Sequence, residues 1–185
     1  MDKILNLSSL RFLLLFLLFF SLQGCRPSSE EQYKTVFSEA TRISNQQTRV
    51  MNQWAREFGP VFTEKNRAQF PSNRDWLNSR AQKIIPLIDE SLRLSNAAVE
   101  KYEEASRLMS NDQQRRGLSL MVASFRKGIE IEQMFKAQAL LASDETITDA
   151  RTFNERFSHF DELIRQKQKE HDDQFDEGKR LMLMQ

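Results

Sequence analysis

Two histidines, His159 and His171, are the side chains of this sequence best suited to bind a metal ion. Twelve positions separate them, which on an ideal helix places them about 120° apart, unsuitable for two ligands of one ion. Glu155 precedes His159 by four residues, whereas helical bundles that bind paired irons use a Glu-x-x-His step of three. A single cysteine also excludes the Cys-x-x-Cys-His motif of haem attachment. We therefore expect neither a metal nor another cofactor.

Acidic residues gather in Glu103-Glu104 and in Glu130-Ile131-Glu132. Carboxylates one or two residues apart point in different directions on a helix, so neither group forms a catalytic acid and base pair. The sequence contains no serine nucleophile elbow and no glycine-rich phosphate loop. These observations predict that the chain is not an enzyme.

His171 and Gln168 share a helical seam with Phe157, Ile164 and Phe175. One interpretation is a buried polar layer that sets helix register or responds to pH through the imidazole. The alternative is a partly exposed histidine near the end of a helix. The sequence leaves both open.

The first 25 residues have the organisation of a secretory signal. Lys3 and Arg11 precede nine consecutive apolar residues, Phe12 to Phe20, and small or polar residues follow. Nine apolar residues are too few for a helix that spans a bilayer, which needs roughly 20. An uncleaved anchor or a buried helix is the weaker alternative.

The segment Leu22-Gln23-Gly24-Cys25 resembles the lipobox of bacterial lipoproteins, although Gln23 departs from the usual small residue. The resemblance implies cleavage between Gly24 and Cys25 and attachment of diacylglycerol to the Cys25 thiol, with acylation, often by palmitate, of the new amino terminus. Several acyl chains would anchor the protein stably, because each buried methylene contributes about 0.8 kcal/mol. A free thiol or an intermolecular disulfide is the alternative for Cys25.

Arg26 stands where many Gram-negative lipoproteins retained at the inner membrane carry aspartate. The resemblance therefore implies the periplasmic face of the outer membrane, or the outer face of the single membrane in a Gram-positive host. The implied organisation is a signal peptide at 1–24, the lipidated cysteine and a short tether at 25–29, and a helical domain at 30–185.

The composition predicts an all-α domain. Gly and Pro are scarce, and the whole chain carries 27 basic and 26 acidic side chains. Residues 1–24 include Lys3, Arg11 and Asp2, so the remainder is formally neutral and offers no electrostatic footprint for nucleic acid. Without a second cysteine no intramolecular disulfide can form, so packing must stabilise the domain.

Apolar residues spaced by three and four predict long amphipathic helices over about 30–58, 72–109, 110–142 and 149–182. Gly59-Pro60 should end the first helix, and Pro86 should kink or break the second. Ser110 and Gln113 suggest a capping box for the third, and Gly178 a weak point in the fourth. Residues 60–71 should form a short helix or a packed loop.

Short connections favour antiparallel neighbours, so we expect an elongated bundle of four helices with coiled-coil-like packing, or of three with segment 60–71 across one end. Trp54, Phe58, Phe62, Phe70 and Trp76 should pack as core at one end of the bundle, and the alternative is an aromatic cluster that anchors a partner. The tail Leu181-Met182-Leu183-Met184 is a candidate contact for a partner or a membrane, because four successive apolar residues cannot all face one core.

Two functional hypotheses follow. The leading one is a lipid-anchored, non-catalytic scaffold or accessory module that recruits an unidentified protein partner at the membrane. The alternative is a carrier that holds an apolar ligand or a lipid between its helices.

Overall fold

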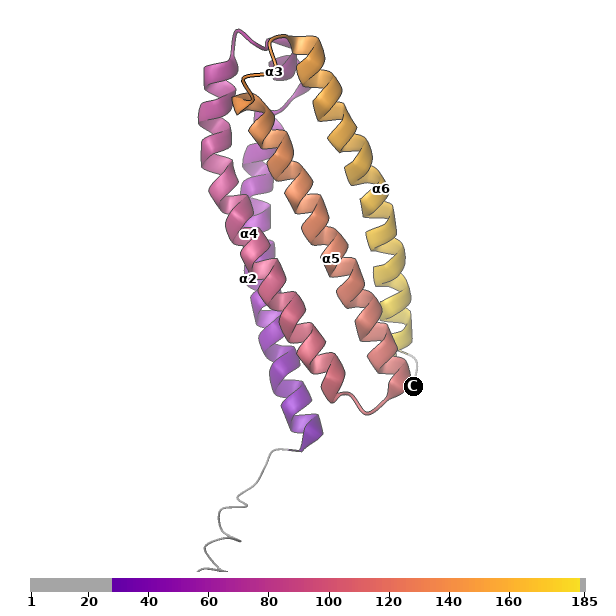
Figure 1. Ribbon diagram of the computed structural model, residues 1–185. Helices are drawn as coiled ribbons and strands as arrows, with labels where there is room; N and C mark the ends of the chain where they lie inside the picture. The colour runs from indigo at the N-terminus through magenta and orange to yellow at the C-terminus, as the bar shows by residue number, and fades with distance from the viewer. Residues whose placement is uncertain (1–27, 184–185) are drawn as a thin grey trace, which may run out of the picture.

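The computed structural model describes residues 28–183, and residues 1–27 and 184–185 are outside this range (Figure 1). The predicted signal peptide, the cleavage site after Gly24 and the lipidation site Cys25 thus lie outside the described residues, as does Met184 of the apolar tail.

Residues 28–183 form helices and short connections and contain no strand. Its elements are α2 (Ser29–Val61), α3 (Glu64–Ala68), α4 (Arg74–Leu108), α5 (Asp112–Leu140), the short 3-10 helix η1 (Leu141–Ser143) and α6 (Ala150–Leu183). The four long helices alternate in direction, and α3 lies at the end of the bundle that is uppermost in Figure 1. The predicted antiparallel all-α bundle is confirmed.

The long helices form two hairpins, because α2 packs along α4 and α5 packs along α6. Backbone contacts between α4 and α5 join the hairpins. Helices α2 and α6 share no comparable backbone contact within the described residues. We call the end of the bundle that carries α3 the upper end, and the end where α2 begins and α6 finishes the lower end (Figure 1).

Local capping explains where the helices begin. The Ser28 hydroxyl accepts from the backbone N–H of Glu31, whose carboxylate accepts from the Ser28 backbone N–H at 2.9 Å, a complete capping box. The cap of α5 is Asn111, whose side-chain oxygen accepts from two backbone N–H groups at 3.0 Å. The prediction that Ser110 caps this helix was wrong by one residue, because the Asn111 amide satisfies those donors.

Two prolines lie inside helices instead of ending them. Pro60 is within α2, which ends at Val61, and Pro86 is within α4, which continues unbroken to Leu108. Pro86 is exposed, while Ile84 and Ile88 beside it are buried. Burial of these flanking side chains offsets the one hydrogen bond that the ring removes, so the predicted break does not occur.

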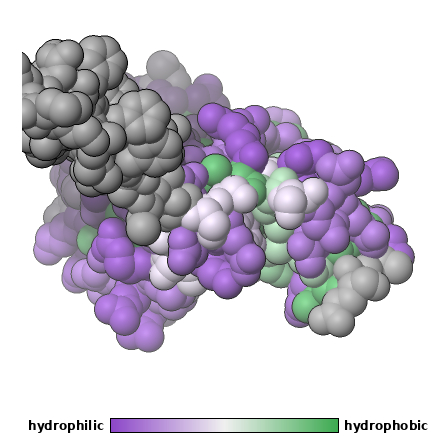
Figure 2. Space-filling view, turned by 90° about the horizontal axis from the view of Figure 1, so that it is seen from below, coloured by the Kyte–Doolittle hydropathy of each residue, from purple (hydrophilic) through white to green (hydrophobic). Residues whose placement is uncertain are grey.

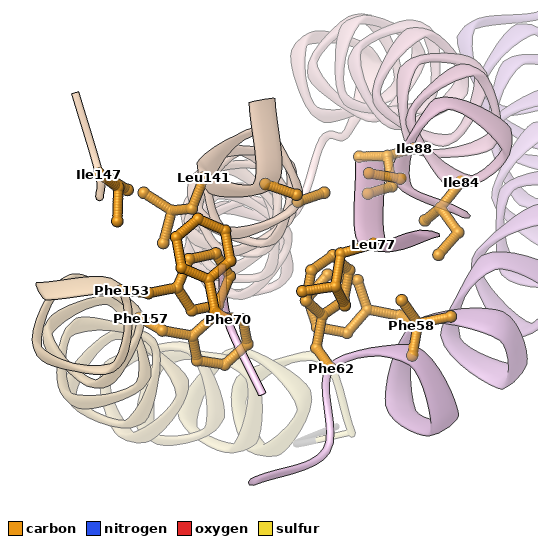
Figure 3. Close-up of a cluster of buried hydrophobic side chains, with 14 of the residues drawn as sticks. Phe58, Phe62, Phe70, Leu77, Ile84, Ile88, Leu141, Ile147, Phe153 and Phe157 are labelled. Carbon is orange, nitrogen blue, oxygen red and sulfur yellow. The ribbon is translucent and has the colours of Figure 1, made fainter. Parts of the chain in front are cut away.

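The apolar core consists of two clusters. The upper cluster joins Phe58 and Phe62 to Phe70, Phe153 and Phe157 (Figure 3). Phe70 stacks on Phe153 with ring centroids 4.5 Å apart, and Phe62 stacks on Phe157 at 5.7 Å. This packing closes the upper end between α2 and α6, and it confirms the predicted aromatic core.

Trp76 is the exception among the five aromatic residues predicted to pack at this end, since it is 42% exposed.

The lower cluster contains Ala40, Tyr102 and Leu118, with Met182 of the apolar tail packed against it. The tail therefore stays helical as far as Leu183, with Met182 directed to the core and Leu183 71% exposed.

Gly117 of α5 and Gly178 of α6 lie where these two helices approach most closely. A Cβ atom at Gly117 would lie 2.8 Å from the backbone oxygen of Gly178, and one at Gly178 would lie 2.7 Å from that of Gly117. Gly178 is therefore a packing position and not the weak point predicted from its helix propensity alone.

We predict that Gly117→Ala destabilises the protein by about 1–3 kcal/mol, because the methyl group overpacks against backbone that cannot turn aside. Gly59→Ala is the matched control, since nothing lies within 4 Å of its Cβ position. This control should be neutral or stabilising by up to about 1 kcal/mol through helix propensity. Chemical denaturation measures both, and equal effects would contradict the close helix approach.

Candidate ligand-binding site

Four polar residues occupy positions on the apolar stripes of three helices. Gln47 lies seven residues after Ala40 and seven before Trp54, both buried in α2. Ser91 and Ser95 lie at the same helical spacing as the buried residues of α4. Glu132 lies at the same helical spacing as the buried residues of α5. Heptad spacing places such residues on the face that packs inward. The two apolar clusters are consequently separated by a polar layer, which we define as Gln47, Ser91, Ser95 and Glu132.

The Gln47 side chain connects the polar layer across the bundle. Its Nε2 atom donates to Oε1 of Glu132 at 2.6 Å and to Oγ of Ser91 at 3.1 Å. One amide thereby links α2 to α4 and to α5, although α2 and α5 share no extensive backbone contact. The Glu132 carboxyl group is held in one orientation as a result.

Glu132 is 5% exposed, and its second oxygen, Oε2, is buried without a hydrogen-bond partner among the described residues. Burial raises the pKa of Glu132 above its ordinary value of 4.5. The polar groups of Ser91, Gln47 and Ser95 nearby oppose this shift, because they favour the charged form. Desolvation is the larger effect, because no cation lies beside the carboxyl group to compensate it.

A cavity of about 390 Å³ lies beside the polar layer, between the upper and lower clusters. Its apolar wall includes Met51, Trp54, Val99, Tyr102, Phe125 and Phe135, contributed by α2, α4 and α5. Its polar wall includes Gln47, Ser95 and Glu132, together with Gln168 and His171 of α6.

The cavity opens between α2 and α6. Its most exposed lining residues are Thr48 of α2 and Gln168 of α6, whereas every lining residue on α4 and α5 is buried or half-buried. The upper cluster closes this seam above through the contact of Phe58 and Phe62 with Phe157. A ligand could therefore reach the cavity through the side of the bundle.

Glu132 and His171 are the acidic and the basic side chain of the cavity wall, and none of the lysines and arginines among residues 28–183 lines it. A hydrogen bond of 2.9 Å joins the Nδ1 atom of His171 to Oδ1 of Asp172, and the His171 ring stacks parallel to that of Phe175. His171 lies in the cavity wall with its side chain 25% exposed, so it combines the inward position of one interpretation with the partial exposure of the other.

The two histidines do not meet, because His159 is exposed and its ring contacts Phe160 on its own helix. Within residues 28–183 no group of three histidine, cysteine or acidic side chains is arranged to hold a metal ion. In the same range no helix is both long enough and apolar enough to cross a bilayer. Leu181, Met182 and Leu183 of the apolar tail lie at the lower end and are not part of the cavity wall.

Sequence reasoning missed Glu132 as a site residue. It excluded Glu130 and Glu132 as a catalytic pair, and the structure separates them: Glu130 forms an ion pair with Lys167, while Glu132 turns inward. The available signal was the spacing of Glu132, three residues after Ile129 and three before Phe135 on the apolar stripe.

No family model, curated protein or solved structure matches this chain.

We predict that Glu132→Gln removes a pH-dependent loss of stability. Because burial raises the pKa of Glu132 in the folded state, the folded protein binds more protons than the unfolded chain above pH 4.5. The stability of the unsubstituted protein should therefore fall as the pH rises through the interval between 4.5 and the raised pKa.

Above that interval Glu132→Gln should be more stable, by about 1.4 kcal/mol for each unit by which the pKa of Glu132 is raised, because glutamine does not ionise in its buried position. Denaturant unfolding at a series of pH values measures the difference. A parallel pH dependence in the protein and the variant would show that Glu132 is not buried as described.

Proposed function

We propose that this protein is a lipid-anchored, non-catalytic binding module on the periplasmic face of a bacterial outer membrane. The lipobox-like segment ending at Cys25 supports the anchor, and the formally neutral helical domain supports a role other than nucleic-acid binding. If the host has a single membrane, the same chemistry would hold the domain on its outer face.

The short distance between Cys25 and α2 supports a position close to the bilayer. Helix α2 begins at Ser29, so only three residues separate it from the cysteine. At roughly 3.3–3.6 Å per extended residue, this segment reaches no more than about 15 Å. The lower end of the bundle would then face the membrane. Figure 2 shows that end from below, with mainly hydrophilic residues and a few hydrophobic ones between them.

We predict that Cys25→Ser moves the protein from the membrane fraction to the soluble fraction after the signal peptide is cleaved. Without the thiol there is no site for diacylglycerol, and the described helices offer no alternative membrane span. Ser28→Ala is a control that should stay with the membrane. Mass spectrometry of the extracted protein measures the acylation directly, and a Cys25→Ser protein that still sediments with membranes would contradict the anchor.

Among binding functions, the geometry best supports a carrier that holds a small ligand between its helices. The observation that carries this proposal is the cavity of about 390 Å³ whose wall includes Glu132, with an unpartnered buried oxygen. Trp54 in the same wall has a buried Nε1 atom that also has no hydrogen-bond partner within the described part of the chain. Small-molecule sites commonly combine such an apolar wall with a few convergent polar atoms.

We predict that a defined small molecule co-purifies with the membrane-extracted protein and is absent from Ala98→Leu. Ala98 lines the cavity and is 5% exposed, so a larger side chain there occupies the ligand volume. Ala55→Leu, on the exposed face of α2, is the matched control and should retain the molecule. Native mass spectrometry and solvent extraction make the measurement. Recovery of the same molecule from both variants would contradict the carrier function. Recovery of no small molecule from either variant or from the unsubstituted protein would also contradict it.

A second candidate is the recruitment of a protein partner at the membrane. The exposure of Leu183 and Trp76, at opposite ends of the bundle, favours it. The membrane-extracted protein distinguishes the two candidates. Partner recruitment requires a protein that cross-links to it in a fixed ratio, whereas the carrier function requires a small molecule that co-purifies with it.

A further inference from the structure

We infer that the cavity beside Glu132 binds an organic amine with a compact apolar body, whose ammonium group is paired with the Glu132 carboxylate. This inference rests on the proposed carrier function and names the chemical class of its ligand.

The unpartnered oxygen of Glu132 requires a hydrogen-bond donor. Gln47 occupies Oε1 at 2.6 Å and leaves Oε2 without a partner, in a side chain that is 5% exposed and part of the cavity wall. A buried carboxylate is costly unless it is both paired and hydrogen-bonded. A protonated amine supplies the donor and the compensating charge together, which an alcohol or an apolar ligand does not.

The charges around the cavity disfavour an anionic ligand. None of the lysines and arginines among the described residues lines the wall to pair with a carboxylate or a phosphate, and the one histidine there, His171, already has its Nδ1 atom hydrogen-bonded to Asp172. Lysines on the neighbouring surfaces are already paired with acidic residues: Lys127 with Glu170, Lys136 with Asp89, and Lys167 with Glu130. A fatty acid would instead place a like charge beside Glu132.

Aromatic rings border the cavity on both sides of the polar layer. Trp54 and Phe135 have ring centroids 5.2 Å apart toward the upper cluster, and Tyr102 and Phe125 have centroids 5.3 Å apart toward the lower one. Such rings accommodate an apolar ligand body and also attract a cation through their faces. The combination of one acid and two aromatic pairs suits an arylalkylamine.

The size of the cavity limits the ligand. A volume of about 390 Å³ lies at the small end of the range of roughly 300–1,000 Å³ found for small-molecule sites. A ring with a short amine chain fits this volume, whereas a phospholipid with two acyl chains does not.

The test compares three probes of similar size: 2-phenylethylamine, 2-phenylethanol and 3-phenylpropanoate. Each is titrated calorimetrically into the mature lipidated protein in nanodiscs, with empty nanodiscs as the reference. We expect the amine to bind at least tenfold more tightly than the alcohol, and the carboxylate to bind most weakly. This order arises in the unsubstituted protein, so it does not depend on the folding of any variant.

Two substitutions locate the effect. Glu132→Gln keeps the size of the side chain and should weaken binding of the amine at least tenfold, with little change for the alcohol. Glu130→Gln is the matched control on the same helix, because Glu130 pairs with Lys167 outside the cavity. It should leave the affinity for all three probes unchanged.

Equal affinity for the amine and the alcohol, or amine binding that Glu132→Gln does not weaken, would overturn the inference and leave a general apolar carrier. Failure of all three probes to bind, with no small molecule recovered from the native protein, would overturn the carrier function as well. A cavity filled only with water would give that second result.

Discussion

The hydrogen bond from Gln47 to Glu132 is the constraint on which the arrangement of this bundle depends. It joins α2 to α5, two helices without extensive backbone contact, and so ties the first hairpin to the second. Because both side chains lie on apolar stripes, a shift of either helix along its axis would break the bond and leave a buried acid without any partner. A buried polar group of this kind can specify helix register at a cost in stability. The apolar core is divided in two at this level, and the cavity lies beside the division.

Most of the fold was predictable because it follows from local rules. Apolar spacing located all four long helices within a few residues of their observed bounds, and the short connections implied antiparallel packing. The errors occurred where tertiary contacts outweigh local preference. Packing of Ile84 and Ile88 keeps α4 continuous through Pro86, and the approach of α6 gives Gly178 a packing role that helix propensity does not reveal. The cap at Asn111 was missed because Ser110 beside it is an equally suitable residue by type.

The candidate site was much less predictable, because its partners come from distant parts of the chain. Gln47 and Glu132 are 85 residues apart, and neither is unusual within its own helix except for its place on an apolar stripe. The spacing between Glu130 and Glu132 in the sequence gave no indication that Glu132 contacts Gln47. The cavity depends on how side chains of four helices fill their shared space, which spacing alone does not determine. Cys25 is the opposite case, since its assignment rests on a contiguous motif and on no packing at all.

The central claim is that Glu132 is a buried carboxyl group facing a ligand cavity, and side-chain NMR tests it most directly. A pH titration of the Glu132 carboxyl carbon in the ligand-free protein reports the pKa of that group alone. Our account predicts a pKa above the ordinary glutamate value of 4.5, because burial is the largest influence on this side chain. A pKa at or below 4.5 would show that Glu132 is solvated or paired with a cation, and would contradict the account.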